Sequence, residues 1–190
     1  YAFGRFYITK KPTRPFCNIL ANKSFGTLIS DKALGFTFAI NARENKLTPW
    51  YNDTMSDNNG ERLLVKVGSK IYDLLDGSLV SFTPDDALYE GSLCGIDFQV
   101  KVYVPSTGMK KRCELVFENT TDQTVGLECA YYTEPVLGVN RDSTRHISAS
   151  FKNNQLILKN SYSSEISGYM LISSDCDVTH YTCDRTGFIA

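Results

Sequence analysis

The stretch CGIDFQVKVYVP, residues 94–105, decides the fold class of this chain. Polar and apolar side chains alternate along it, with Asp97, Gln99, Lys101 and Tyr103 between the apolar residues Ile96, Phe98, Val100, Val102 and Val104. A period of two is typical of a β-strand that buries one face. We therefore predict a half-buried strand here.

The same period continues on the far side of a turn at residues 105–108. Cys113, Leu115 and Phe117 alternate with polar residues, which predicts the hairpin partner of the first strand. A second turn at residues 119–122 leads to another alternating run over residues 125–131. Three alternating runs joined by turns predict an antiparallel meander.

The rest of the chain contains short strand-like runs separated by Gly, Pro, Asn and Ser, and none has helical length or period. The predicted strands are Phe3–Thr9, Asn18–Ala21, Gly26–Ser30, Gly35–Ile40, Arg62–Val67, Ile71–Leu75, Ile147–Phe151, Leu156–Leu158, Tyr169–Ser173 and Val178–Cys183. An Asn-rich turn at residues 152–155 makes a hairpin of the pair around it. No strand is predicted between Leu75 and Cys94. Many short strands without helices predict an all-β, antiparallel, two-sheet sandwich that forms a single domain over residues 1–190.

Composition excludes several classes of partner. The 190 residues carry a net charge of -1, and the longest basic run is Lys110–Arg112, which we expect to be solvated. Nucleic-acid binding is therefore not indicated. No run approaches the ~20 apolar residues of a membrane span, so we expect no direct membrane insertion.

Cysteine and histidine patterns predict no metal site and no cofactor. The six cysteines and two histidines, His146 and His180, lack zinc-ligand spacing. Cys113 and Cys129 lie in apolar strand runs, where we expect them to behave as small buried hydrophobic residues. Free thiols and a cytoplasmic location are the resulting expectations. Asp85 and Asp86 follow Pro84, and we predict that they are solvated turn residues.

One long polar stretch, residues 41–60, interrupts the strands. Its first part offers a cation, amides, a carboxylate and an indole, namely Arg43, Asn45, Trp50, Asn52 and Asp53. Sugar recognition uses such groups, because forked polar groups pair with hydroxyls and aromatic rings stack on pyranose faces. These five residues are the candidate substrate-binding residues. The alternative is that Trp50 only plugs the loop into the domain and that Arg43 faces solvent.

At this loop the sequence resembles glycoside hydrolase family 94, most closely the phosphorylase-like region of cyclic β-1,2-glucan synthases. The matching segments are Arg14-Pro15, Asn18–Asn22, Phe25–Ser30, Gly35–Phe38, Asn41–Asp53 and Asp184–Phe188. The segment Asn41–Asp53 is the longest and most specific of them. Cys17 departs from the family pattern, which tends to have Trp at this position.

The resemblance implies an N-terminal supersandwich of the galactose-mutarotase-like type, followed after residue 190 by a catalytic (α/α)₆ barrel. The chain begins without Met, and we expect it to be a piece of a longer protein. The family phosphorolyses β-glucosidic bonds with inversion, using a barrel aspartate as general acid and inorganic phosphate as co-substrate. The resemblance therefore implies an accessory carbohydrate-binding domain with no catalytic residue of its own. Its implied partners are a β-glucan or oligosaccharide and its own C-terminal barrel. A homodimer, and attachment of the parent to the inner membrane through other domains, are left open.

Two alternatives stay open from the sequence. The chain could be a stand-alone lectin-like module that binds glucan. It could also be an aldose-mutarotase-like enzyme that uses His146, His180 and a carboxylate.

Overall fold

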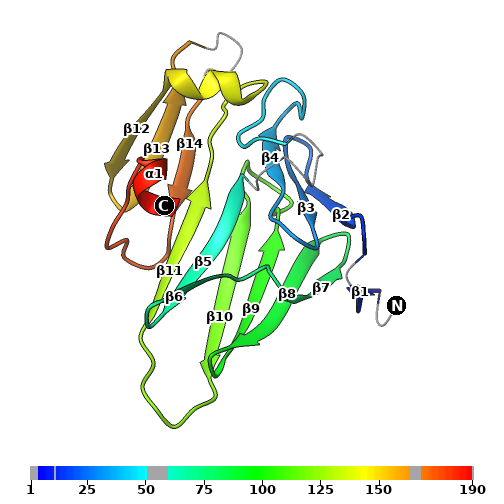
Figure 1. Cartoon of the computed structure of the whole chain (residues 1–190). Helices are drawn as coiled ribbons and strands as arrows, with labels where there is room; N and C mark the ends of the chain where they lie inside the picture. The colour runs from blue at the N-terminus through cyan, green and yellow to red at the C-terminus, as the bar shows by residue number, and fades with distance from the viewer. Residues whose placement is uncertain (1–3, 11, 51–59, 163–167, 190) are drawn as a thin grey trace.

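The computed structural model describes residues 4–10, 12–50, 60–162 and 168–189, and nearly all regular structure in them is antiparallel β-sheet. The largest sheet has the strand order β1-β7-β8-β9-β10 (Figure 1). Its strands are β1 (Phe6–Ile8), β7 (Leu79–Phe82), β8 (Asp86–Leu93), β9 (Ile96–Tyr103) and β10 (Arg112–Asn119). The all-β prediction is confirmed, as is the β9–β10 hairpin, in which Val100 faces Leu115.

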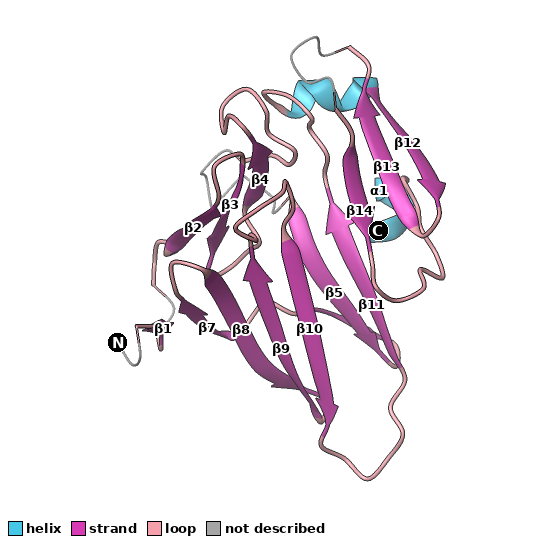
Figure 2. Ribbon diagram, turned by 180° about the vertical axis from the view of Figure 1, so that it is seen from behind, coloured by secondary structure: helices cyan, strands magenta, loops and turns pink. Residues whose placement is uncertain are grey.

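Three smaller sheets complete the domain, with the orders β2-β3-β4, β11-β5-β6 and β12-β13-β14. Their strands are β2 (Cys17–Ala21), β3 (Phe25–Ser30), β4 (Phe36–Ala39), β5 (Glu61–Val67), β6 (Lys70–Asp73), β11 (Leu127–Thr133), β12 (Ile147–Lys152), β13 (Gln155–Asn160) and β14 (Met170–Ser173). Two short helical segments, η1 (Arg141–His146) and α1 (Arg185–Ile189), accompany β12–β14 (Figure 2).

The main core joins the five-stranded sheet to the sheets β2-β3-β4 and β11-β5-β6. Its buried side chains come from most of these strands and include Leu20, Ile29, Val65, Val80, Tyr89, Val100 and Val102. Side chains of β9 alternate between buried and exposed as predicted. A separate small core of Leu137, Leu158 and Met170 holds β12–β14. Burial of period-two faces against one another stabilises the sandwich.

The predicted Asn turn between β12 and β13 is confirmed in detail. Asn153 and Asn154 have φ values of 52° and 61°, and Lys152 faces Gln155 across the turn. Two consecutive residues in the left-handed region are the mark of a type I′ turn, whose twist matches that of a hairpin.

Three features of the fold differ from the sequence predictions. Strand β11 leaves the predicted meander and pairs with β5, so that Tyr131 faces Leu63. Strands β7 and β8 were missed, although Ala87 and Tyr89 of β8 are fully buried. The segment 178–183, predicted as a strand, has no regular secondary structure.

Asp86 also differs from its prediction as a solvated turn residue. It begins β8 with only 14% of its side chain exposed, and its Oδ1 lies 2.7 Å from the Arg5 guanidinium. Lys101 approaches the other carboxylate oxygen at 3.8 Å. The carboxylate is therefore paired across the sheet, whereas the neighbouring Asp85 is exposed as predicted.

Candidate functional site

The candidate loop is tied to the sheets along its backbone from residue 41 to residue 48. Asn45 N donates to Asn41 O at 2.9 Å and Leu47 N donates to Thr37 O at 2.8 Å, which continues the edge of β4. On the opposite side Lys46 and Gly138 exchange two hydrogen bonds of 3.0 Å. The loop is thus an ordered hairpin between β4 and the segment after β11, at the same end of the molecule as η1 (Figure 1).

Arg43 lies at the tip of this hairpin and points into solvent. Its side chain is 87% exposed, and its Nε lies 3.2 Å from Glu44 Oε1. Asn41 Oδ1 accepts hydrogen bonds from the backbone N–H groups of Arg43, at 2.8 Å, and Glu44, at 3.2 Å. This local Asx turn fixes the backbone under the guanidinium while leaving its donors accessible to a ligand.

Asn45 turns inward from the same hairpin. Its side chain is half-buried, and its Oδ1 is buried without a hydrogen-bond partner among the described residues. A buried amide oxygen without a partner is costly, and this atom has almost no exposed surface in the structure. The two remaining predicted site residues, Asn52 and Asp53, lie outside the described residues.

Trp50 is half-buried and packs on the outer face of the sheet β2-β3-β4. Its ring system stacks on Phe36 with centroids 5.8 Å apart and planes at 27°, and Phe36 is itself buried. Trp50 therefore anchors the loop to the sheet, while part of its indole stays accessible.

A buried polar cluster lies on the inner side of the same sheet, directly behind the loop. Glu61, whose side chain is 0% exposed, forms an ion pair with Lys111, which is 8% exposed. Three hydroxyl groups complete the coordination of the carboxylate, from Thr37, Thr48 and Tyr131, at 2.6, 2.6 and 2.8 Å. Lys111 was predicted to be solvated, and this is wrong, because Glu61 draws its ammonium group into the interior.

Burial and the neighbouring Glu61 carboxylate raise the pKa of Tyr131 well above its ordinary value. Its hydroxyl therefore stays protonated and donates to the carboxylate. The cluster joins β3, β4, the loop, β5, β10 and β11, and β5 lies beside β10 in Figures 1 and 2. No local sequence signal reveals it, since its members are spread from residue 27 to residue 131.

A family model described as the glycosyl hydrolase 94 supersandwich domain matches residues 3–190. The chain belongs to this family. The supersandwich chain is also 26% identical over 198 residues to the cyclic beta-(1,2)-glucan synthase NdvB of Rhizobium meliloti (strain 1021). That match covers 93% of this chain and 7% of the relative, so the chain spans a small part of the relative's length. The predicted membership of family 94 and the antiparallel sandwich are both confirmed.

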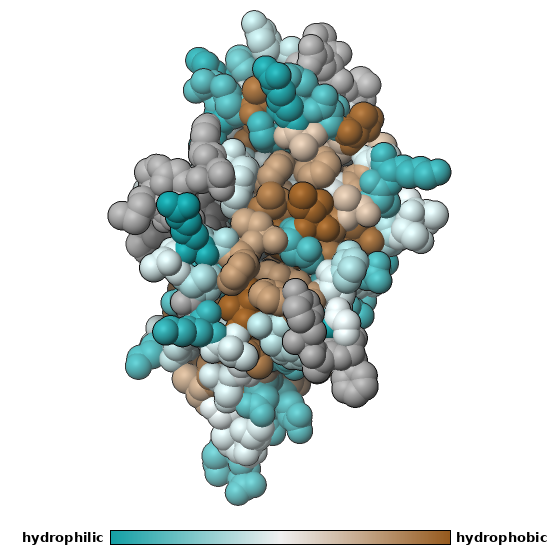
Figure 3. Space-filling model, turned by 90° about the vertical axis from the view of Figure 1, so that its right-hand side faces the viewer, coloured by the Kyte–Doolittle hydropathy of each residue, from teal (hydrophilic) through white to brown (hydrophobic). Residues whose placement is uncertain are grey.

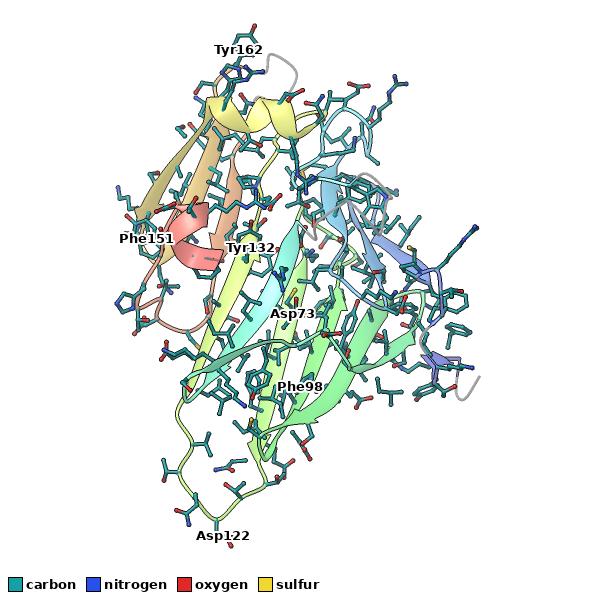
Figure 4. All side chains as sticks on the ribbon, in the orientation of Figure 1. Asp73, Phe98, Asp122, Tyr132, Phe151 and Tyr162 are labelled. Atoms are coloured by element: carbon teal, nitrogen blue, oxygen red, sulfur yellow. The ribbon has the colours of Figure 1, made fainter. Side chains whose placement is uncertain are left out.

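The histidines of the supersandwich domain are exposed. The His146 ring stacks on Tyr162 with centroids 4.4 Å apart, at the end of the molecule opposite Asp122 (Figure 4). His180 lies in the segment that follows β14. Among the described residues, no cluster of three or more His, Cys, Asp or Glu side chains could hold a metal ion. No described helix is long and apolar enough to cross a membrane.

The side of the supersandwich domain that carries β1 and β2 has an apolar band across it (Figure 3). Strand β2 and the residue before it carry the exposed apolar side chains of Ile19 and Phe16, which are 61% and 48% exposed. Ile19 lies on the same face of its sheet as Leu28 and Phe36, which are its neighbours in register. The indole of Trp50 therefore rests on the apolar face of which Ile19 forms the edge.

Proposed function

We propose that this supersandwich domain is an accessory carbohydrate-binding domain of a family 94 enzyme, and that the loop 41–50 holds a β-glucan beside a separate catalytic domain. The observation that carries the proposal is the geometry of the loop. An exposed guanidinium and a partly accessible indole lie on one ordered hairpin. Sugar hydroxyls can pair with the forked donors of a guanidinium, and the apolar face of a pyranose can stack on an indole.

Cleavage is assigned in this proposal to the intact enzyme. Its general acid would come from a separate barrel domain and its nucleophile would be inorganic phosphate, while the supersandwich domain orients the glucan. The relative's name supports glucan chemistry, since that protein is a cyclic beta-(1,2)-glucan synthase. The isolated chain should consequently release no glucose 1-phosphate from β-glucans in phosphate buffer.

Titration calorimetry of the chain with linear β-1,2-, β-1,3- and β-1,4-linked glucans tests the proposal. We expect saturable binding of at least one linkage, lost in Arg43→Ala and retained in Lys152→Ala, which removes an exposed cation from another sheet. Equal binding by both variants, or no binding of any glucan, would refute the assignment of this loop. Phosphorolysis by the isolated chain would instead refute the accessory role.

A further inference from the structure

We propose that Glu61 is a positioning residue for the loop 41–50, holding Thr48 on the inner side of β4 so that Trp50 is seated on the outer side. The effect of Glu61 on glucan binding rests on the function proposed above. Its effect on the position of the loop does not depend on that function.

The carboxylate of Glu61 divides its bonds between the loop and the rest of the core. Oε1 accepts from the hydroxyls of Thr48 and Thr37, each at 2.6 Å. Oε2 accepts from Tyr131 at 2.8 Å and pairs with Lys111. One oxygen thus serves the loop and β4, and the other is held by β11 and the start of β10.

Thr48 is the residue through which the carboxylate controls the loop. It is fully buried, and its hydroxyl both donates to Glu61 and accepts from Thr37 N at 2.8 Å. Because its one hydroxyl proton goes to the carboxylate, the oxygen lone pairs are left to accept from β4. Losing the carboxylate would therefore leave the hydroxyl of Thr48 without its acceptor.

The two sides of β4 connect Thr48 to Trp50. Neighbouring strand residues point to opposite faces, so the hydroxyl of Thr37 joins that of Thr48 at Glu61 on the inner face, while Phe36 carries Trp50 on the outer face. The chain passes between these two contacts at Pro49, which is buried. Trp50 can occupy its stacked position only while Thr48 stays in place.

Gly60 reinforces the same arrangement one residue before Glu61. A Cβ at position 60 would lie 2.7 Å from Pro49 Cδ, closer than such contacts occur, so that only glycine lets Pro49 approach. The adjacent residues Gly60 and Glu61 therefore hold Pro49 and Thr48, respectively. This pair of contacts fixes the point where the loop returns to the core.

The test uses Trp50 itself, because it is the sole tryptophan of the sequence and its emission reports on the loop alone. Thr48→Val removes the loop's hydrogen bond to Glu61, and Thr48→Ser keeps it. Tyr131→Phe is the matched control, since it removes a hydrogen bond to the same carboxylate from β11 and not from the loop. Emission maximum, acrylamide quenching, melting temperature and glucan affinity are measured for all three.

We expect Thr48→Val and Tyr131→Phe both to lower the melting temperature, but only Thr48→Val to shift the Trp50 emission to longer wavelength and to increase its quenching. Thr48→Ser should restore the wild-type emission. Glucan binding should weaken about tenfold in Thr48→Val, which corresponds to about 1.4 kcal/mol. Thr48→Ala, which removes the hydroxyl without adding a methyl group, serves the same purpose should Thr48→Val not fold.

Failure of the two proposals can be told apart. If wild-type protein binds no glucan while Thr48→Val still shifts the emission, the glucan-binding function is refuted and the positioning role stands. If Thr48→Val and Tyr131→Phe give the same Trp50 emission, the positioning role is refuted. If Thr48→Val shifts the emission but binds glucan with wild-type affinity, the positioning role stands and its consequence for glucan binding is refuted.

Discussion

Phe188 of α1 stacks on Tyr132 of β11, with ring planes 3° apart and centroids 5.9 Å apart. Glu134 supports the same contact, since its Oε1 accepts from the Tyr132 hydroxyl at 2.6 Å and lies 3.3 Å from the Arg185 guanidinium. Burial and the bond to Glu134 raise the pKa of Tyr132 to about 12, so the hydroxyl remains a donor under ordinary conditions. The helix α1 is thereby attached to β11 by one stacked pair and one ion pair.

Removing Phe188 should therefore release α1 without unfolding the sandwich. Aromatic pairs contribute about 0.5 to 1.5 kcal/mol beyond their buried area, and exposed ion pairs about 0 to 1 kcal/mol. In Phe188→Ala we expect faster amide hydrogen exchange over residues 185–189 and unchanged exchange in β9. Tyr162→Ala, which breaks another aromatic stack, is the control. Unchanged exchange over 185–189 in Phe188→Ala would contradict the role assigned to the stack.

The buried ion pair predicts a large difference between two lysine substitutions. Lys111→Met leaves the Glu61 carboxylate buried without its counter-ion, and removing one partner of such a pair costs about 3 to 5 kcal/mol. Lys66→Met breaks the exposed pair with Glu128 and should cost about 1 kcal/mol or less. Urea unfolding curves with matching slopes would measure both free energies. A similar loss in the two variants would show that the burial of Lys111 has little energetic weight.

Arg43 and Trp50 should differ in how they affect stability. Arg43→Ala removes an exposed side chain, so the free energy of unfolding should stay within about 0.5 kcal/mol of wild type. Trp50→Ala removes a half-buried ring from Phe36, and we expect a loss below the roughly 3 to 5 kcal/mol of a fully buried aromatic residue. Trp50→Phe should retain most of the free energy of unfolding that Trp50→Ala loses. Thermal melts of the three variants, combined with glucan titration, separate anchoring from binding; a destabilised Arg43→Ala would be inconsistent with its exposed position.

The cysteines predict an order of chemical reactivity. All six are free thiols, and Cys113 is the least exposed of them. Its burial raises its pKa to about 11, from an ordinary value of 9.0. Because the thiolate is the reactive form, Cys113 should be alkylated last in the native protein, while unfolding should expose all six. Mass spectrometry of iodoacetamide-treated protein gives the order, and early labelling of Cys113 would contradict it.

The same pKa sets the sign of an alkaline effect. Between pH 9 and 11 the unfolded chain loses the Cys113 proton while the folded chain keeps it, so the wild type should lose stability as pH rises through this window. Cys113→Val has nothing to titrate there, and its free energy of unfolding should fall less steeply. Parallel pH profiles of the two proteins would rule out a contribution from this thiol.

Local pattern predicted those parts of the fold whose partners are close in sequence. The alternation of β9 and the turn at Asn153–Asn154 are local properties, and both were predicted correctly. The pairing of β11 with β5 was not, because it joins strands about sixty residues apart and no local period specifies it. In β8 the buried residues Ala87 and Tyr89 are followed by Gly91, which lies against the ring of Phe98. A glycine at a position that packs closely interrupts the alternation of apolar side chains, so the strand is not evident from the sequence.

The same contrast between local patterns and contacts distant in sequence applies to the candidate site. The loop residues could be proposed from the sequence because an unusual set of side chains stands together in it. Lys111 and Glu61 were missed because a charge beside a turn normally faces water, and only the folded chain brings this lysine to a carboxylate fifty residues away. The segment 178–183 has strand-forming residues, but in the structure it is exposed and lacks ladder partners.

The turn near Asp122 and the hairpin tip at Arg43 lie at opposite ends of the long axis of the molecule (Figures 1 and 4). Residues 118–124 are exposed, and the hydrogen bonds of this turn are largely with one another and with Gly95. A biotin or fluorescent label joined at Asp122 would accordingly present the loop outward from a sensor surface. The turn is thus a suitable tethering point for single-molecule or surface measurements that test the proposed glucan binding.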